Sequence, residues 1–152
     1  MTATKRKCDA KRTPGRKGTY LLFLTFTEQR NIQVGSLGTL NTEAGEYCYV
    51  GSAMNGLDNR LKRHFSDKKK IHWHIDRLTL SADSMEAYVP SIPTEECRLA
   101  AAAEECGCLP VFSGFGSSDC RCRTHLFRVS GASKPKLLSA SAAEPYDVTQ
   151  QE

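Results

Sequence analysis

Clustered apolar positions predict three β-strands in the first third of the chain. Residues 18–26 begin at a glycine and continue as an almost unbroken apolar and aromatic run, which is typical of a buried strand. Residues 32–34 form a short candidate partner, and Gly35 and Gly38 indicate turns after it. The third run is residues 47–51. These segments predict a small antiparallel sheet with its strands in meander order.

Beyond residue 51 the apolar positions recur at helical spacing. A first helix is expected at about residues 56–66, and a second follows it. Their apolar positions are Leu57, Leu61 and Phe65 in the first, and Ile71, Ile75 and Leu78 in the second. A third helix begins after Pro93-Thr94 and ends at Gly107. Further strands are expected at 85–89 and 123–129, so the predicted fold class is α/β (α+β), a three-stranded antiparallel sheet flanked by helices.

Composition divides the chain into a folded centre and two tails. Residues 1–17 carry seven Lys and Arg against one Asp and lack apolar periodicity, which predicts a disordered basic arm. Residues 130–152 are rich in Ser and Ala and are expected to be a disordered tail. The single domain is therefore predicted at residues 18–129.

The chain has no apolar run near the roughly 20 residues that a membrane-spanning helix requires. Its basic, polar N-terminus lacks the pattern of a secretory signal. We therefore expect a soluble cytoplasmic protein, with no membrane association, no obligate protein partner, and seven reduced cysteines.

A cluster of positive charge lies within the predicted domain. Residues 60–70 hold six Lys and Arg against Asp67 alone. Such a patch is typical of phosphate binding, although a solvated helix face explains it equally well when it is taken alone.

Several ordered motifs together resemble one known family. Gly18-Thr19-Tyr20 and Tyr49-Val50-Gly51 are followed nine residues after Gly51 by Arg60 and then by His64. The wider string consists of Tyr-Val-Gly-Ser-Ala at 49–53, Gly-Leu-x-x-Arg-Leu-x-x-His at 56–64, Lys-Lys-x-His-Trp-His-Ile-Asp at 69–76, Glu-Cys-x-Leu-Ala at 96–100 and Gly-Phe-Gly-x-x-Asp-Cys-x-Cys-x-x-His-Leu-Phe at 114–127. This string resembles the Uri-type branch of the GIY-YIG nuclease superfamily, over about residues 18–129.

The resemblance implies a metal-dependent endonuclease that hydrolyses phosphodiester bonds in nucleic acid, with DNA as the expected partner and a role in repair or processing. The catalytic residues that it implies are Tyr20, Tyr49, Arg60, His64 and Glu96. The two tyrosines would converge at one end of the sheet, and one of them would act on the attacking water. Arg60 suits a phosphate clamp because a guanidinium can hold two phosphate oxygens. Glu96 is the implied ligand of one weakly bound Mg²⁺ or Mn²⁺.

A second group of residues is expected to bind the substrate. Gly51 would let the backbone pass close to the nucleic acid, or turn sharply off the strand where a Cβ could clash. The other members are Lys68, Lys69, Lys70, His72, Arg121 and Arg123. Residues i and i+2 of a helix point in different directions, so His72 and His74 are not both expected to face the site. The resemblance implies His72, which follows Arg60 at the spacing where related nucleases place a second histidine, and Trp73 is expected to pack rather than to stack on a base.

Two departures from the family pattern leave alternatives open. Tyr20 and Tyr49 are about 29 positions apart, which is longer than usual in the superfamily, so Tyr47 is a reserve candidate for Tyr20. Asp119 stands in the region where the family usually has an asparagine. It could orient a neighbour or add a second metal ligand.

The cysteines favour two other functional classes. Soft ligands for a structural zinc are present in Cys106, Cys108, Cys120, Cys122 and His125, which would make the chain a binding module without catalysis. A cysteine nucleophile, Cys120 with His125, is a weaker alternative because the sequence offers no evident residue to orient the histidine.

Overall fold

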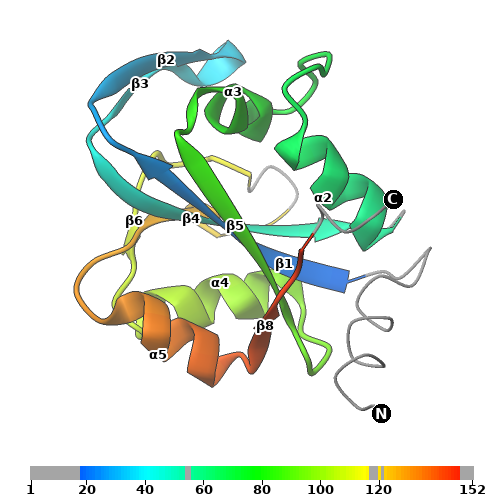
Figure 1. Cartoon of the computed structure of the whole chain (residues 1–152). Coiled ribbons are helices and arrows are strands. Elements are labelled where there is room, and N and C mark those ends of the chain that lie inside the picture. The colour runs from blue at the N-terminus through cyan, green and yellow to red at the C-terminus, as the bar shows by residue number, and fades with distance from the viewer. Residues whose placement is uncertain (1–17, 54–55, 117–119, 121, 148–152) are drawn as a thin grey trace.

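The computed structural model describes residues 18–53, 56–116, 120 and 122–147. They form a mixed α+β fold built on a six-stranded antiparallel sheet (Figure 1). The strands, in spatial order, are β6 (Leu109–Pro110), β7 (Leu126–Arg128), β4 (Gly45–Ala53), β1 (Gly18–Phe26), β5 (Ser84–Pro90) and β8 (Ala143–Pro145). The predicted basic arm, residues 1–17, lies outside the described residues.

Strand β1 is the centre of the sheet, because it pairs with β4 on one side and β5 on the other. Its even-numbered residues from Tyr20 to Phe26 enter one hydrophobic core, and Leu21 and Phe23 enter a second core on the opposite face. Burial of both faces explains why this strand reads as a continuous apolar run rather than as an alternation.

Four α-helices among the described residues cover the two faces of the sheet (Figure 1). Helices α2 (Leu57–Phe65) and α3 (His74–Ser81) cover the first core, and α4 (Glu96–Glu105) and α5 (Ser133–Ala140) cover the second. The structure thus confirms the first and third predicted helices and the strands predicted at 18–26, 47–51 and 85–89. None of the described helices is long and apolar enough to cross a bilayer.

The predicted three-strand meander is wrong in its pairing. Strand β2 (Arg30–Val34) does not join β1 but pairs with β3 (Gly38–Thr42), and a 3₁₀ turn, η1 (Gly35–Leu37), connects them. The resulting hairpin is a separate two-stranded sheet that packs against α3. Because the backbone groups of β2 pair with those of β3, it is β4 that pairs directly with β1.

The second helix begins later than its apolar spacing suggests. Helix α3 starts at His74, and Ile71 lies outside it with 42% of its surface exposed. The buried carboxylate of Asp76 accepts hydrogen bonds from the backbone N–H groups of His72 and Trp73 and from the guanidinium of Arg63. These contacts hold residues 72–73 in an extended conformation and fix the start of the helix.

The prediction that residues 130–152 are disordered is wrong for most of that segment. Helix α5 packs on the second core through Leu137, and β8 adds an edge strand next to β5. Lys134 forms salt bridges with Glu46 and Glu86. The segment was missed because its few apolar residues lie among Ser and Ala, and the strand expected at 123–129 is only three residues long and is not the last.

Candidate active site

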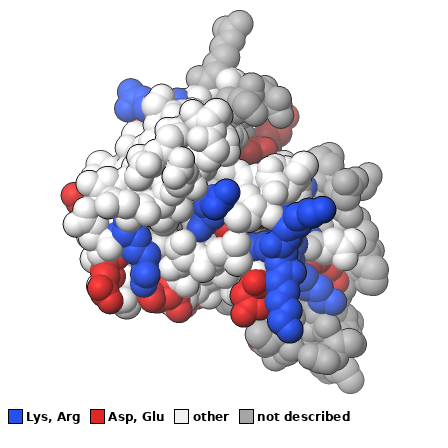
Figure 2. Space-filling view, turned by 90° about the horizontal axis from the view of Figure 1, so that it is seen from above, with Lys and Arg blue, Asp and Glu red and all other residues white. Residues whose placement is uncertain are grey.

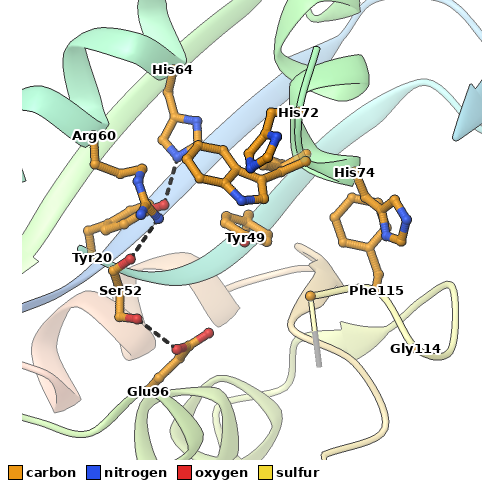
Figure 3. Close-up of a pocket in the computed structure, with 13 residues that line it drawn as sticks. Tyr20, Tyr49, Ser52, Arg60, His64, His72, His74, Glu96, Gly114 and Phe115 are labelled. Atoms are coloured by element: carbon orange, nitrogen blue, oxygen red, sulfur yellow. Dashed lines mark hydrogen bonds between the residues drawn. The ribbon is translucent and has the colours of Figure 1, made fainter. Parts of the chain in front are cut away.

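A cleft of about 390 Å³ gathers polar side chains at one end of the central strands (Figure 3). Strands β1 and β4, helices α2, α3 and α4, and the segment around Phe115 all contribute to its wall. Its lining residues are Tyr20, Tyr49, Ser52, Arg60, His64, His72, Trp73, His74, Ile75, Glu96, Gly114, Phe115 and Gly116. All five predicted catalytic residues are in this set.

Tyr20 and His64 form a buried pair at the base of the cleft. Tyr20 leaves β1 toward α2, and its Oη lies 2.6 Å from Nε2 of His64. Both side chains are at most 1% exposed. Nδ1 of His64 has no hydrogen-bond partner among the described residues, so the imidazole is oriented by its contact with Tyr20 and by packing against the ring of Tyr49.

The surroundings keep both members of this pair neutral. Burial raises the pKa of Tyr20 well above its usual value, and the neighbouring Tyr49 adds to the effect. Burial also lowers the pKa of His64 to about 3, and the positive charges of Lys69 and Arg60 contribute. At neutral pH, the pair is therefore a neutral phenol in a hydrogen bond with an uncharged imidazole.

Tyr49 reaches the same cleft from β4. Its ring centroid lies 6.3 Å from that of Tyr20 and 6.0 Å from that of Phe115. Burial raises its pKa, and the negative charge of Glu96 raises it further. The expected convergence of two tyrosines is confirmed, and the reserve candidate Tyr47 is not among the cleft residues, because its hydroxyl donates to the carbonyl oxygen of Glu43.

Gly51 leaves the space that the rings of Tyr20 and Tyr49 occupy, and it is not among the residues that line the cleft. An added Cβ would lie 2.5 Å from Cζ and Oη of Tyr20 and 2.9 Å from Cε2 of Tyr49. The two rings therefore occupy the space that a side chain at position 51 would need. The expectation that a Cβ at position 51 could clash is confirmed, because this backbone lies against the two phenol rings, and the predicted contact of Gly51 with substrate stays a prediction.

Arg60 lies one turn before His64 on α2, and both side chains face the cleft as predicted. One guanidinium N–H donates to the carbonyl oxygen of Ser52 at 2.8 Å. The guanidinium also lies 4.4 Å from the ring centroid of Trp73, which a second cation, Arg63, approaches to 4.7 Å. Trp73 is 37% exposed and helps to hold Arg60 at the wall of the cleft.

Glu96 lies in the first turn of α4 and faces the cleft from the side opposite α2 (Figure 3). Its Oε1 accepts a hydrogen bond from the hydroxyl of Ser52 at 2.9 Å, and its Oε2 lies 2.7 Å from Nδ1 of His125. Burial alone would raise the pKa of Glu96, but the hydrogen bonds from His125 and Ser52 outweigh burial and lower it. The group is therefore a carboxylate at neutral pH.

Both histidines near the start of α3 line the cleft. The expectation that only His72 would face it assumed that His72 and His74 belong to one helix. Because His72 lies in the extended segment before α3, the helical angle between the two positions does not apply. His74 is close to Phe115, with 6.0 Å between the ring centroids.

The three lysines of the basic patch have different surroundings. Nζ of Lys69 donates to the carbonyl oxygens of Arg63 and His64 and to the hydroxyl of Thr79, so this lysine caps α2 and ties it to α3. The predicted contact of Lys69 with the nucleic-acid backbone stays a prediction, and these three hydrogen bonds would have to weaken to allow it. Lys68 and Lys70 are exposed.

The remaining predicted binding residues do not join the cleft. Arg123 is exposed in the loop before β7 and is not among the cleft residues. Arg121 and Asp119 lie outside the described residues. Figure 2 shows the Lys and Arg side chains of the described residues in separate groups interspersed with Asp and Glu, so the described part of this face carries no continuous positive surface.

Sequence reasoning did not identify Ser52 and Phe115 as site residues, and it did not connect His125 with Glu96. All three lie inside the motifs at 49–53 and 114–127, which were the available signal. Their roles could not be seen because each depends on contacts between distant segments, such as the one between Glu96 and His125.

Comparisons with curated proteins and with solved structures give no match. One family model does match, over residues 19–147, a range that includes α5 and β8 as well as every described cleft residue. That model is described as Domain of unknown function DUF123, and this chain belongs to that family.

Proposed function

We propose that this chain is a metal-dependent endonuclease that hydrolyses phosphodiester bonds in DNA, in repair or processing, and that it is related to the Uri-type GIY-YIG nucleases. The observation that carries the proposal is the convergence of Tyr20, Tyr49, Arg60, His64 and Glu96 in one cleft. These residues come from four separate elements that span 76 positions of the sequence. Hydrolysis requires a group that binds phosphate, a route for a proton and an anionic metal ligand, and the cleft offers all three.

Arg60 is suited to hold the scissile phosphate. The carbonyl oxygen of Ser52 and the ring of Trp73 fix its guanidinium, so little side-chain entropy remains to be lost on binding. The planar group carries five N–H donors, and the contact with Ser52 uses one of them. A bidentate contact with two phosphate oxygens would stabilise the charge that develops during hydrolysis.

Tyr20 and His64 are suited to move the proton of the attacking water. The water would give a proton to Oη of Tyr20 while the phenolic proton passes to Nε2 of His64, so that neither side chain has to become an anion. The low pKa of His64 results partly from Lys69 and Arg60. A phosphodiester bound at Arg60 would counter these charges and make the imidazole a better acceptor.

Glu96 fits a hard divalent cation. Its carboxylate is ionised and 28% exposed, and each oxygen accepts one hydrogen bond, which leaves lone pairs for coordination. A single carboxylate with waters and substrate phosphate is a common environment for Mg²⁺. When bound, such an ion supplies Lewis acidity to the phosphate and lowers the pKa of coordinated water.

The test is cleavage of radiolabelled branched, single-stranded and duplex DNA, with RNA counterparts, in Mg²⁺ and Mn²⁺. We expect cleavage of at least one substrate by the wild type, its loss in Glu96→Gln and normal cleavage in Glu95→Gln. Glu95 is the matched control because it precedes α4, is exposed and does not line the cleft. Equal loss in both variants, or none in either, would remove Glu96 from the mechanism.

A second candidate is a nucleic-acid-binding module without catalysis. It is favoured by the group of cysteines beside His125, which is suited to a structural metal. Binding of DNA without cleavage in either metal, by the wild type and Glu96→Gln alike, would select this alternative.

A further inference from the structure

Behind Glu96, four potential metal ligands meet at the protein surface. They are Cys97 in the first turn of α4, and Cys120, Cys122 and His125 from the segment before β7. One ligand atom from each residue lies within 4.8 Å of the other three. Among the residues that the structure describes, this is the only group of its kind, and Cys106 and Cys108 are not in it.

One distance within the group matches an edge of a zinc tetrahedron. With Zn–S bonds of about 2.3 Å and Zn–N bonds of about 2.0–2.1 Å, tetrahedral ligand atoms lie about 3.5–3.8 Å apart. The distance between Sγ of Cys120 and Nε2 of His125 is 3.5 Å. A disulfide would require two sulfurs at about 2.05 Å, and the described cysteines form none.

His125 is oriented as zinc-binding histidines are. Its Nδ1 lies 2.7 Å from Oε2 of Glu96, which leaves Nε2 directed at the cysteines. A carboxylate that accepts the other N–H of a ligating histidine is the usual second partner of such sites, because it fixes the tautomer and the ring orientation. The side chain is 2% exposed, so this orientation is enforced by packing as well.

We propose that Cys97, Cys120, Cys122 and His125 bind one tetrahedral zinc ion with a structural role. Three thiolates and an imidazole favour zinc over Mg²⁺, and a complete set of four protein ligands leaves no position for substrate. The ion would fasten the start of α4 to the segment before β7. Because Glu96 is adjacent to one ligand and hydrogen-bonded to another, the zinc would also fix the carboxylate that faces the cleft.

The first experiment measures metal in the full-length protein, purified without chelators after expression with added zinc. We expect about one zinc per chain, and X-ray absorption should report three sulfur ligands and one nitrogen. Cys97→Ser and Cys122→Ser should lose most of the zinc, whereas Cys106→Ser, the matched control outside the group, should retain it. Absence of zinc from the wild type, or equal loss from Cys106→Ser, would overturn the proposal.

A second measurement on the wild type covers the case in which the cysteine variants do not fold. Alkylation followed by mass spectrometry should show Cys97, Cys120 and Cys122 protected in the zinc-loaded protein and modified after a chelator is added. Their modification at the same rate in both states would refute the site, and selective modification of Cys120 alone would instead indicate a reactive thiol.

Neither measurement depends on nucleic acid, so the zinc site and the proposed nuclease can fail separately. A protein that binds one zinc but cleaves no substrate would support the zinc site and refute the proposed nuclease activity. Arg60→Lys is the complementary case, because it should lose turnover while its zinc content stays unchanged.

Discussion

The close approach of Gly51 to two phenol rings allows a sharp test of how the cleft is assembled. In Gly51→Ala, the new methyl group would lie 2.5 Å from Cζ and Oη of Tyr20, a separation that real Cβ atoms essentially never show. The ring of Tyr20 cannot move away without stretching its 2.6 Å contact with His64. The substitution therefore acts on the hydrogen-bonded pair of Tyr20 and His64.

The expected cost can be worked out from three contributions. Overpacking a buried site costs about 1–3 kcal/mol, and a weakened hydrogen bond between Tyr20 and His64 adds about 0.5–1.5 kcal/mol. Replacement of glycine by alanine returns about 0.4–1 kcal/mol by restricting the unfolded chain. The net loss of unfolding free energy should be about 0.5–4 kcal/mol, and a domain of this size loses about 2–4 °C in Tm per kcal/mol.

Thermal unfolding followed by far-UV circular dichroism measures this loss, and the near-UV signal reports on tyrosine packing. The matched control is the same change in a Tyr20→Leu background, which lacks the Cζ and Oη atoms that the methyl group would meet. There, Gly51→Ala should cost clearly less, because only the 2.9 Å approach to Cε2 of Tyr49 remains. An unchanged Tm in the wild-type background, or an equal loss in both backgrounds, would refute the steric argument.

Three further predictions concern the charged residues. Arg60→Lys should reduce turnover by about a hundredfold or more with little change in DNA affinity, because the planar guanidinium is lost while the charge remains. Single-turnover kinetics measure the turnover, and a binding assay measures the affinity. Lys69→Ala should lower the unfolding free energy by about 1–3 kcal/mol, because three hydrogen bonds are lost. The control Lys68→Ala should leave Tm unchanged and should weaken only the salt-dependent part of DNA binding. Asp76→Asn should cost about 3 kcal/mol or more in chemical denaturation, because it breaks a buried ion pair, while exposed Asp67→Asn should be neutral.

Asp76 also predicts how stability depends on pH. Burial would raise its pKa, but the N–H groups of Trp73 and His72 and the guanidinium of Arg63 outweigh burial and lower it. Its contribution is therefore fully present above the unfolded value of about 3.9 and is lost as pH falls through the lower folded value. Denaturation of the wild type between pH 5 and about 2 should show this loss, and Asp76→Asn should show less of it.

How much of the fold the sequence predicts depends on how local each signal is. Strand β1 and helix α2 were identified because a buried run and a 3.6-residue period are visible within one segment. The partner of β1 was misassigned because pairing is a long-range choice, and the hairpin of β2 and β3 removes from the sheet the strand that is nearest in sequence. Helix α5 was missed because its stability comes from Leu137 against the second core and from the ion pairs of Lys134.

In the candidate site, too, local relations could be predicted from the sequence and long-range contacts could not. Arg60 and His64 were placed together because they are one helical turn apart, which is a local relation. The contact of Glu96 with His125 joins positions 29 residues apart and has no local signature. Lys69 was grouped with its neighbours by charge alone, and only the positions of two carbonyl oxygens and the hydroxyl of Thr79 show that it caps a helix.

Glu96 lies where the two proposed metal sites meet, and this position changes how metal dependence should be interpreted. One of its oxygens is hydrogen-bonded to His125, a proposed zinc ligand, and the other accepts a hydrogen bond from Ser52. The carbonyl oxygen of Ser52 in turn accepts a hydrogen bond from Arg60. Loss of the proposed zinc would therefore release Glu96 and disturb Arg60, the proposed phosphate clamp, although the zinc is proposed only as a structural ion. A chelator that abolishes cleavage does not by itself identify the catalytic ion. If Mg²⁺ alone restores cleavage after mild chelation that leaves about one zinc per chain, the reacting ion is the weak one at Glu96. If restoration requires zinc after stronger chelation, the four-ligand site supports the geometry on which Glu96 depends.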